Sequence, residues 1–171
     1  FYNNSILFIC IYAIKKITWL NTTVGAIPGA MPTLGGWAAS ANALNPNAWI
    51  LFAILFFWQH PHFYAIALMC KEDYKKAGFK MLPAMENESH RTNRQIIWHA
   101  FLLIPVSLFF VVTGVLGNFY FWGAFILGII YLLSSIPLLR DSSIKNAKLL
   151  LKASVFYLPV LLVIIIIDLN Y

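Results

Sequence analysis

Long apolar stretches separated by short polar segments dominate the sequence. Few charged residues interrupt these stretches, and most of the stretches approach the roughly 20 residues that a helix needs to cross a bilayer. The pattern therefore predicts about six transmembrane helices. We expect them at residues 1–14, 24–41, 48–69, 96–116, 119–139 and 149–167.

The composition agrees with a membrane protein. Hydrophobic residues make up 61% of the 171 residues and charged residues only 11%, so there is too little polar surface to cover a water-soluble core. We expect an all-α fold, a polytopic transmembrane helical bundle in which residues 1–171 form a single domain. Because the first span is short and begins without Met, we expect the chain to be N-terminally truncated.

Basic residues fall in every second loop. The 12 Lys and Arg residues lie in or beside residues 15–23, 70–95 and 140–148, whereas residues 42–47 and 117–118 carry no charge. The positive-inside rule then predicts a multi-pass membrane protein with its basic loops in the cytoplasm, and we expect it in the cell (inner) membrane. Because topology alone explains the net charge of +6, we expect a lipid bilayer and no nucleic acid as the partner.

Candidate chemistry lies at the C-terminal end of the third span. Residues 58–83 read WQHPHFYAIALMCKEDYKKAGFKMLP. On a helix that turns about 100° per residue, His62 and Asp73 lie within roughly 20° of each other and Trp58 lies about 40° from His62, whereas His60 points elsewhere. A satisfied core histidine is the common alternative, but ionisable residues inside a membrane span are functional candidates by default.

Asp73 is placed where a carboxylate can meet a metal and a phosphate. Carboxylate oxygens bind Mg²⁺, and the neighbouring lysines can contact phosphate oxygens as point charges. The structural alternative is a surface helix with intrahelical ion pairs, such as Glu72 with Lys75 or Lys76. The sequence leaves both interpretations open.

Two earlier segments also have a structural and a functional interpretation. The turn that contains Lys15 and Lys16 is either a helix N-cap or an anion-contacting turn. In the second span, Gly25 and Gly29 form a small-xxx-small pair that favours close helix packing. The irregular second helix is alternatively suited to shaping a ligand pocket.

At these residues the sequence resembles the protoheme IX farnesyltransferases, or haem O synthases, of the UbiA-type intramembrane prenyltransferase superfamily. The combination WQ-x-PHF followed by DY-x-x-AG-x-x-MLP is specific to this branch. The matching stretches are KKITWLNTTVGAIPGAMPTLGGW at 15–37, FFWQHPHFYAIALMCKEDYKKAGFKMLP at 56–83, RTNRQIIWHAFLLIPVSL at 91–108 and NAKLLLKASVFYLPVLLVIIIID at 146–168.

The resemblance implies an enzyme that transfers the farnesyl group of farnesyl diphosphate to a vinyl group of haem b, with Mg²⁺ as cofactor. It implies that Asp73 is catalytic and binds Mg²⁺, with Glu72 as a second candidate ligand, and that His62 is catalytic as a haem ligand or a water-orienting group. The implied substrate-binding residues are Lys15, Lys16, Thr18, Asn21, Trp58, Gln59, Phe63, Lys71, Tyr74, Lys75, Arg91 and Arg94.

The sequence departs from the superfamily pattern in three places. The first acidic Mg²⁺ motif has no counterpart and would lie upstream of Phe1, so we expect about six of the parent's nine or so spans and no activity from the fragment alone. The second motif, usually DxxxD, is reduced to Asp73 followed by Ala77. A Lys-Arg pair is replaced by Lys15 and Lys16, which lack the guanidinium fork.

Two other functions fit the same features. A related prenyltransferase would act on a quinone precursor or a chlorophyll-type acceptor, and product analysis separates it from a haem-modifying enzyme. A channel or transporter subunit would also combine polar residues with broken helices in the membrane, but it would show substrate flux without Mg²⁺ dependence. The resemblance further implies a haem A synthase or a terminal oxidase as a possible partner.

Overall fold

The computed structural model describes residues 18–169. Each secondary-structure element in this range is a helix, and the described residues contain no strand. The elements are α2 (Asn21–Ala41), α3 (Pro46–Met69), α4 (Lys71–Lys76), α5 (Leu82–Met85), α6 (His90–Val112), α7 (Asn118–Ser135), the 3₁₀ helix η1 (Ile136–Leu139) and α8 (Ile144–Leu169).

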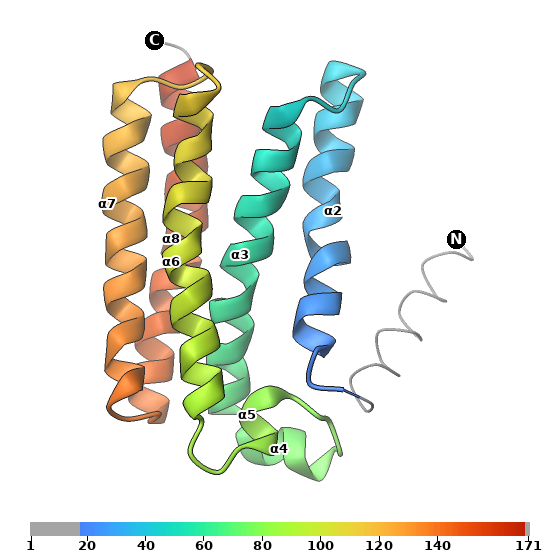
Figure 1. Ribbon diagram of the computed structural model, residues 1–171, viewed down its shortest axis with the longest axis vertical. Helices are drawn as coiled ribbons and strands as arrows, with labels where there is room; N and C mark the ends of the chain where they lie inside the picture. The colour runs from blue at the N-terminus through green and yellow to red at the C-terminus, as the bar shows by residue number, and fades with distance from the viewer. Residues whose placement is uncertain (1–17, 170–171) are drawn as a thin grey trace, which may run out of the picture.

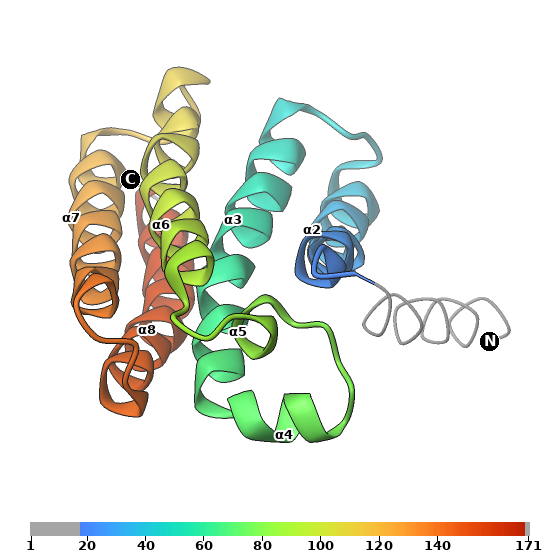
Figure 2. The same cartoon turned by 60° about the horizontal axis from the view of Figure 1, so that its bottom comes forward.

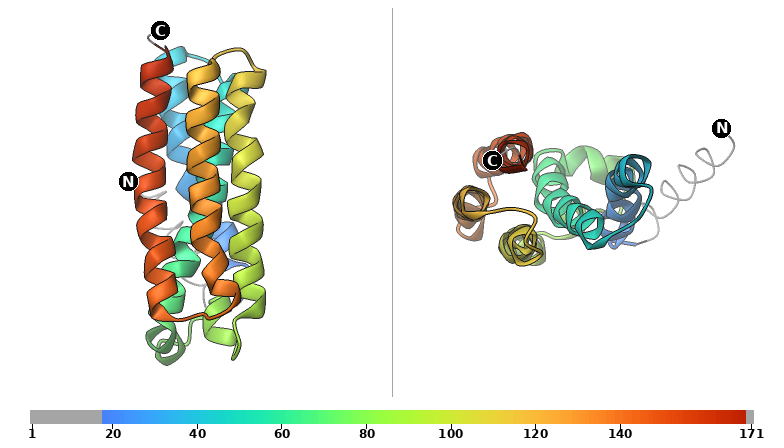
Figure 3. Two further views of the ribbon diagram at one scale, coloured as in Figure 1. Left: turned by 90° about the vertical axis from the view of Figure 1, so that its left-hand side faces the viewer. Right: turned by 90° about the horizontal axis from the view of Figure 1, so that it is seen from above.

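In the described part of the chain, the long helices α3, α6, α7 and α8 form an antiparallel bundle, and α2 packs on its side (Figure 1). Helix α3 packs against α6 and α8, and α7 packs against the same two helices. Helix α2 packs against α3, so that α2 and α8 lie on different sides of α3 when the molecule is seen from above (Figure 3). Helix α3 is thus the element that joins the two parts.

Side chains from all four bundle helices form one core. Ile54, Leu103, Tyr131 and Tyr157 are almost fully buried in it. The rings of Tyr131 and Tyr157 stack with their centroids 5.2 Å apart across α7 and α8. Tyr131 also donates a hydrogen bond to the carbonyl oxygen of Trp58 (3.3 Å), which connects α7 to α3.

The outside of the bundle is apolar. The spans Pro46–Met69, His90–Val112, Asn118–Leu139 and Ile144–Leu169 are long and apolar enough to cross a membrane. This result confirms the all-α, membrane-bundle fold class. Among the described helices α2 falls outside this group, and the expected span at 1–14 lies outside the described residues, so the count of six spans stays a prediction.

The fourth helix differs from its predicted range of 96–116. It begins at His90, and polar residues form its first turns. A pattern of apolar residues cannot reveal such turns. It ends at Val112 because Gly114 adopts a positive φ of 73°, a left-handed conformation that glycine adopts at helix C-termini. The amide groups of Val115 and Leu116 then both donate to the carbonyl oxygen of Phe110.

One end of the bundle carries α4 and α5, which follow α3 (Figure 2). We call it the basic end, because the described Lys and Arg residues lie in α4, in the segments next to it, at the start of α6 or between residues 140 and 152. The side-chain amide of Asn21 ties the start of α2 to this end by donating to the carbonyl oxygen of Lys80 (3.0 Å). The uncharged turns at 42–45 and 113–117 lie at the opposite end (Figure 1).

Candidate functional site

His62 lies between α3 and α8 in contact with Ser154. Its Nδ1 atom is 2.8 Å from the Ser154 hydroxyl oxygen, and its ring stacks on Trp58 with centroids 4.8 Å apart. The indole N–H of Trp58 donates to the carbonyl oxygen of Ser154 (2.9 Å). Phe63, which is 44% exposed, packs edge-on against His62 from the other side. The structure therefore brings together three predicted site residues.

The Ser154 hydroxyl determines which nitrogen of His62 carries the proton. The same hydroxyl lies 2.7 Å from the carbonyl oxygen of Leu151, which can only accept a hydrogen bond. A hydroxyl has one proton to donate, so Ser154 donates to Leu151 and accepts from Nδ1–H of His62. The other ring nitrogen, Nε2, is then left with a lone pair that can act as a base or as a metal ligand.

His60 and His99 form a histidine pair on the face of α3 opposite His62. The sequence did not predict this pair. The rings of His60 and His99 stack in parallel, with centroids 3.9 Å apart and an interplanar angle of 12°. His60 is fully buried and also contacts the Thr23 hydroxyl at 3.3 Å. Each ring places Nδ1 against a carbonyl oxygen of its own helix, at 2.8 Å for His60 and 2.7 Å for His99. Spacing along α3 separates His60 from His62, but no sequence signal placed His99 beside His60.

Gln59 connects α3 to α2. Its buried side-chain amide donates to the carbonyl oxygens of Ala26 (3.3 Å) and Leu55 (3.1 Å). Gly29 makes this contact possible, because a Cβ atom there would lie 2.3 Å from the Gln59 side-chain oxygen. Gly25 has no neighbour within 4 Å of the corresponding position. In the described part of the chain Gln59 thus acts as a packing residue, and its predicted contact with substrate stays a prediction.

Helix α4 presents acidic and basic side chains at the end of α3. Glu72 pairs with Lys75 (3.5 Å), as the surface-helix interpretation predicted. Asp73 is exposed, and its carboxylate makes no ion pair or hydrogen bond to a described residue. Tyr74 packs on Phe79, and burial, with a smaller contribution from Cys70, raises the pKa of Tyr74 above its usual value.

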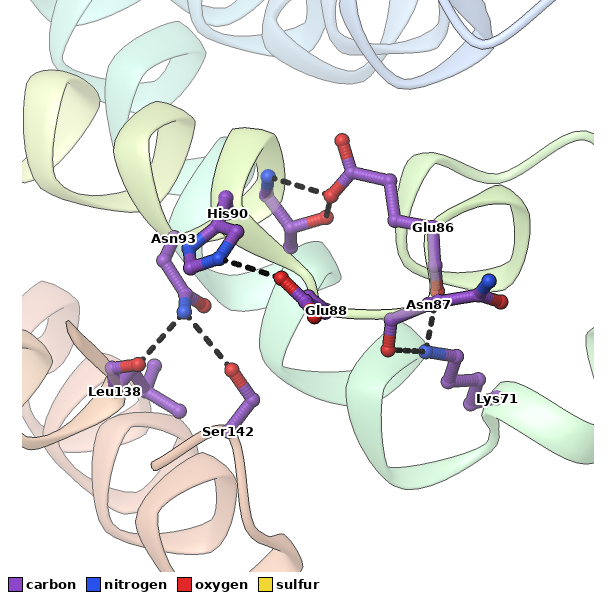
Figure 4. A network of polar contacts seen from close by, with 9 residues as sticks. Lys71, Glu86, Asn87, Glu88, His90, Asn93, Leu138 and Ser142 are labelled. Atoms are coloured by element: carbon purple, nitrogen blue, oxygen red, sulfur yellow. Dashed lines mark hydrogen bonds and ion pairs between the residues drawn. The ribbon is translucent and has the colours of Figure 1, made fainter. Parts of the chain in front are cut away.

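Lys71 supports the turn before α6 (Figure 4). Its ammonium group donates to the carbonyl oxygens of Glu86 (2.5 Å) and Asn87 (3.3 Å). In the same region the Glu86 carboxylate accepts from the backbone N–H and the hydroxyl of Thr92, both at 3.1 Å, and so caps α6. Asn93 donates to the carbonyl oxygen of Leu138 and the hydroxyl of Ser142, which joins α6 to η1 and to the segment before α8. These contacts give Lys71 a structural role.

Arg91 and Arg94 line a pocket that Lys71 does not line. Together with Trp19, Leu82 and Gln95 they line a pocket of about 200 Å³. Thr18, one residue before Trp19, holds the start of α2, because its carbonyl oxygen accepts from the Asn21 side chain (2.9 Å). Lys15 and Lys16, the basic pair predicted to bind substrate, lie outside the described residues. The structure therefore brings the two arginines to the turn that follows the basic pair.

The donor set fits one side of a Mg²⁺ site. The described residues contain no group of three or more His, Cys, Asp or Glu side chains that could hold a metal on their own. Mg²⁺ commonly takes one or two carboxylates and completes its shell with substrate phosphates and water. An exposed, unpaired Asp73 supplies one such carboxylate, whereas Glu72 is engaged by Lys75.

Comparison with known proteins identifies the family. Residues 4–160 match the UbiA prenyltransferase family. The chain therefore belongs to this family, and its apolar helices are those of a multi-pass membrane protein. No solved structure matches the chain.

Several curated relatives are similar over most of the chain and carry one name, "Protoheme IX farnesyltransferase". The protein from Solibacter usitatus is 46% identical over 154 residues, which is 90% of this chain and 53% of the relative. The protein from Koribacter versatilis is 40% identical over 172 residues, which is 96% of this chain and 56% of the relative. The chain thus spans about half the length of the curated relatives that it matches.

Proposed function

We propose that the full-length protein transfers the farnesyl group of farnesyl diphosphate to a vinyl group of haem b, which makes haem O. The observation that carries the proposal is similarity along nearly the whole chain to relatives of this name. The arrangement of α3 and α4 supports it, because Asp73 at the basic end follows a helix whose apolar part carries Trp58 and His62.

In the proposed reaction, the bond between farnesyl C1 and the diphosphate oxygen breaks. The vinyl carbon attacks the allylic cation and forms a carbon–carbon bond, which moves the positive charge to the carbon next to the porphyrin. Water adds to that carbon and loses a proton, so the products are haem O, diphosphate and a proton. Mg²⁺, when bound, would neutralise charge that develops on the diphosphate.

The residues of this chain have three tasks in the proposal. Asp73 would hold Mg²⁺ by its free carboxylate, together with acidic residues supplied from elsewhere in the protein, and Arg91 and Arg94 would bind phosphate oxygens. The stacked Trp58 and the exposed Phe63 would present ring faces to the allylic cation. His62 would use its Nε2 lone pair as a haem iron ligand or as an acceptor that orients water.

The proposal includes the setting of the reaction. Diphosphate would bind at the basic end, which would face the cytoplasm of a cell with the protein in its inner membrane. Residues 15–23, 70–95 and 140–148 would form this side. A haem A synthase or a terminal oxidase is the proposed recipient of the product.

The test uses the full-length protein in membranes with haem b, farnesyl diphosphate and Mg²⁺. Extracted haems are separated by chromatography and weighed by mass spectrometry. We expect haem O from the wild type and at least a hundredfold less from Asp73→Asn, which removes a charge from the reaction centre at nearly constant size. Glu88→Gln, at an exposed position on the same end, is the matched control. If the protein instead prenylates an added quinone precursor and forms no modified haem, the proposal is contradicted.

A further inference from the structure

We propose that the outer face of α8 binds an anionic phospholipid. The site consists of Lys145, Lys148 and Lys152, together with Leu149, Phe156 and Val163 on the same side of the helix. We call these six residues the α8 stripe. The inference is independent of the farnesyl transfer proposed above.

The lysines of the α8 stripe point away from the bundle. On a helix, residues 145, 148 and 152 fall within roughly 60° of one another. The buried side of α8, which includes Leu150, Ser154 and Leu161, is centred about 180° from them. All three lysines are exposed, so the internal packing of the bundle does not use this face.

The same lysines are not neutralised by a carboxylate. None of them makes an ion pair or a side-chain hydrogen bond with a described residue, in contrast to Lys71, Lys75 and Arg91. From Ile144 to Ile167 helix α8 contains no acidic residue. Three unpaired cations on one helical face attract an anionic headgroup.

A depression at the start of α8 can receive a headgroup. Its volume is about 490 Å³, and the three lysines line it together with Ile144, Asn146 and Leu149. The lysine ammonium groups supply hydrogen-bond donors there, whereas the side-chain amide of Asn146 already donates to the carbonyl oxygens of Pro137 and Asp141. The side chains of Ile144 and Leu149 form its apolar part.

The apolar half of the α8 stripe continues from this depression toward the opposite end of the bundle. Leu149, Phe156 and Val163 recur every seven residues, so they stay on one side of the helix, and they are 48%, 70% and 53% exposed. The rise from Lys152 to Val163 is about 16 Å, close to half of the roughly 30 Å hydrocarbon thickness. A basic head and an apolar track one leaflet deep match a phospholipid better than a free phosphate.

The positive-inside rule alone explains that lysines are present at this end, but it does not require them to share a face. Sharing a face concentrates the charge at one headgroup position. Each lysine near an anionic membrane surface contributes enough to change the affinity about fivefold. We therefore expect replacement of all three by glutamine to weaken anionic lipid binding by roughly a hundredfold.

The experiment titrates delipidated full-length protein in detergent with phosphatidylglycerol or phosphatidylcholine and follows bound lipid by native mass spectrometry and the Tm. We expect wild type to bind and be stabilised by phosphatidylglycerol selectively, with weaker binding at high salt. K145Q/K148Q/K152Q should lose the selectivity, whereas the charge-retaining K145R/K148R/K152R should keep it. K76Q/K80Q, at exposed positions on the same end, is the control that should behave as wild type.

Three results would overturn the inference. Equal stabilisation of the wild type by the two lipids needs no variant and would show that charge is not recognised. Unchanged selectivity in the triple glutamine variant, or in Lys148→Gln if the triple variant does not fold, would place the lipid elsewhere. Inorganic phosphate that stabilises the protein as well as the lipid does would identify a free-anion site.

Discussion

Nδ1 of His62 lies 2.8 Å from the hydroxyl oxygen of Ser154, a residue 92 positions later in the chain. Because that hydroxyl also donates to the carbonyl oxygen of Leu151 (2.7 Å), it accepts from the imidazole. Ser154 is fully buried, so water does not compete for this contact. Ser154 is thus a positioning residue that keeps the Nε2 lone pair of His62 available.

Replacing Ser154 by Ala should lower haem O formation without unfolding the protein. The lost hydrogen bond is worth about 0.5–1.5 kcal/mol, so we expect a decrease of roughly two- to tenfold in the rate. Ser154→Thr, which keeps the hydroxyl, should restore most of it. The rate is measured at several pH values, because loss of the fixed tautomer should alter the shape of the pH–rate profile as well as the maximum rate.

The control for this prediction is Ser135→Ala. Ser135 is also fully buried and donates to the carbonyl oxygen three residues earlier, but no histidine contacts it in the described part of the chain. It should leave the rate and the pH profile unchanged. If both alanine variants reduce the rate equally, Ser154 has only a packing role.

The apolar pattern was sufficient to predict the four described helices that are long and apolar enough to cross a membrane, because such spans are recognised by composition and length. It was insufficient for helix ends set by polar residues or by backbone geometry, such as His90 and Gly114. In the site, spacing correctly separated the faces of His60 and His62. Their partners His99 and Ser154 come from other helices, and periodicity within one helix carries no information about which neighbour packs on it.

Basic residues that look equivalent in the sequence differ in their exposure and in their contacts in the structure. Lys71 and Arg94 are both cations of the loop at residues 70–95, yet one bonds to two carbonyl oxygens and the other lines a pocket. The difference arises from how the turn before α6 folds back on α4, which is a tertiary contact (Figure 4).

Gly29→Ala should destabilise the protein, whereas Gly25→Ala should not. A Cβ atom at residue 29 would lie 2.3 Å from the side-chain oxygen of Gln59, so the amide must move and give up its bonds to Ala26 and Leu55. We expect a loss of about 1–3 kcal/mol, partly offset by the higher helix propensity of Ala. Thermal unfolding of the full-length protein in detergent measures the difference between the two variants.

The double variant Gly29→Ala/Gln59→Ala separates a local clash from a general effect on α2. If the clash with Gln59 is the cause, the two substitutions should be non-additive, and the double variant should be no less stable than Gln59→Ala alone. Additive losses would show that Gly29 matters for another reason.

Tyr74 should remain neutral through the physiological pH range. Burial raises its pKa above the usual value of 10.0, so the unfolded chain loses this proton at a lower pH than the folded protein does. The folded protein therefore loses stability as pH rises above about 10. Tyr74→Phe should reduce this alkaline loss and leave the Tm at pH 7 to 9 nearly unchanged. An alkaline loss that is identical in wild type and Tyr74→Phe would show that the phenol is freely solvated.

Lys71→Gln and Arg94→Gln should have different effects although both remove one positive charge from the basic end. Lys71→Gln removes a donor to Glu86 and Asn87, so it should lower the Tm by several degrees, which corresponds to about 1–2 kcal/mol. Arg94 is exposed and makes no ion pair with a described residue, so its substitution should leave the Tm unchanged. If Arg94 binds diphosphate, the KM for farnesyl diphosphate should rise about tenfold instead.

The two measurements for this pair are the Tm and the KM of the full-length protein in the same detergent. Arg94→Lys keeps the charge and loses the fork geometry, so its KM should lie between those of the wild type and Arg94→Gln. A raised KM in Lys71→Gln with an unchanged Tm would mean that the Lys71 ammonium group leaves its carbonyl partners to bind substrate. The diphosphate would then contact Lys71 of α4 as well as the pocket with Arg91 and Arg94.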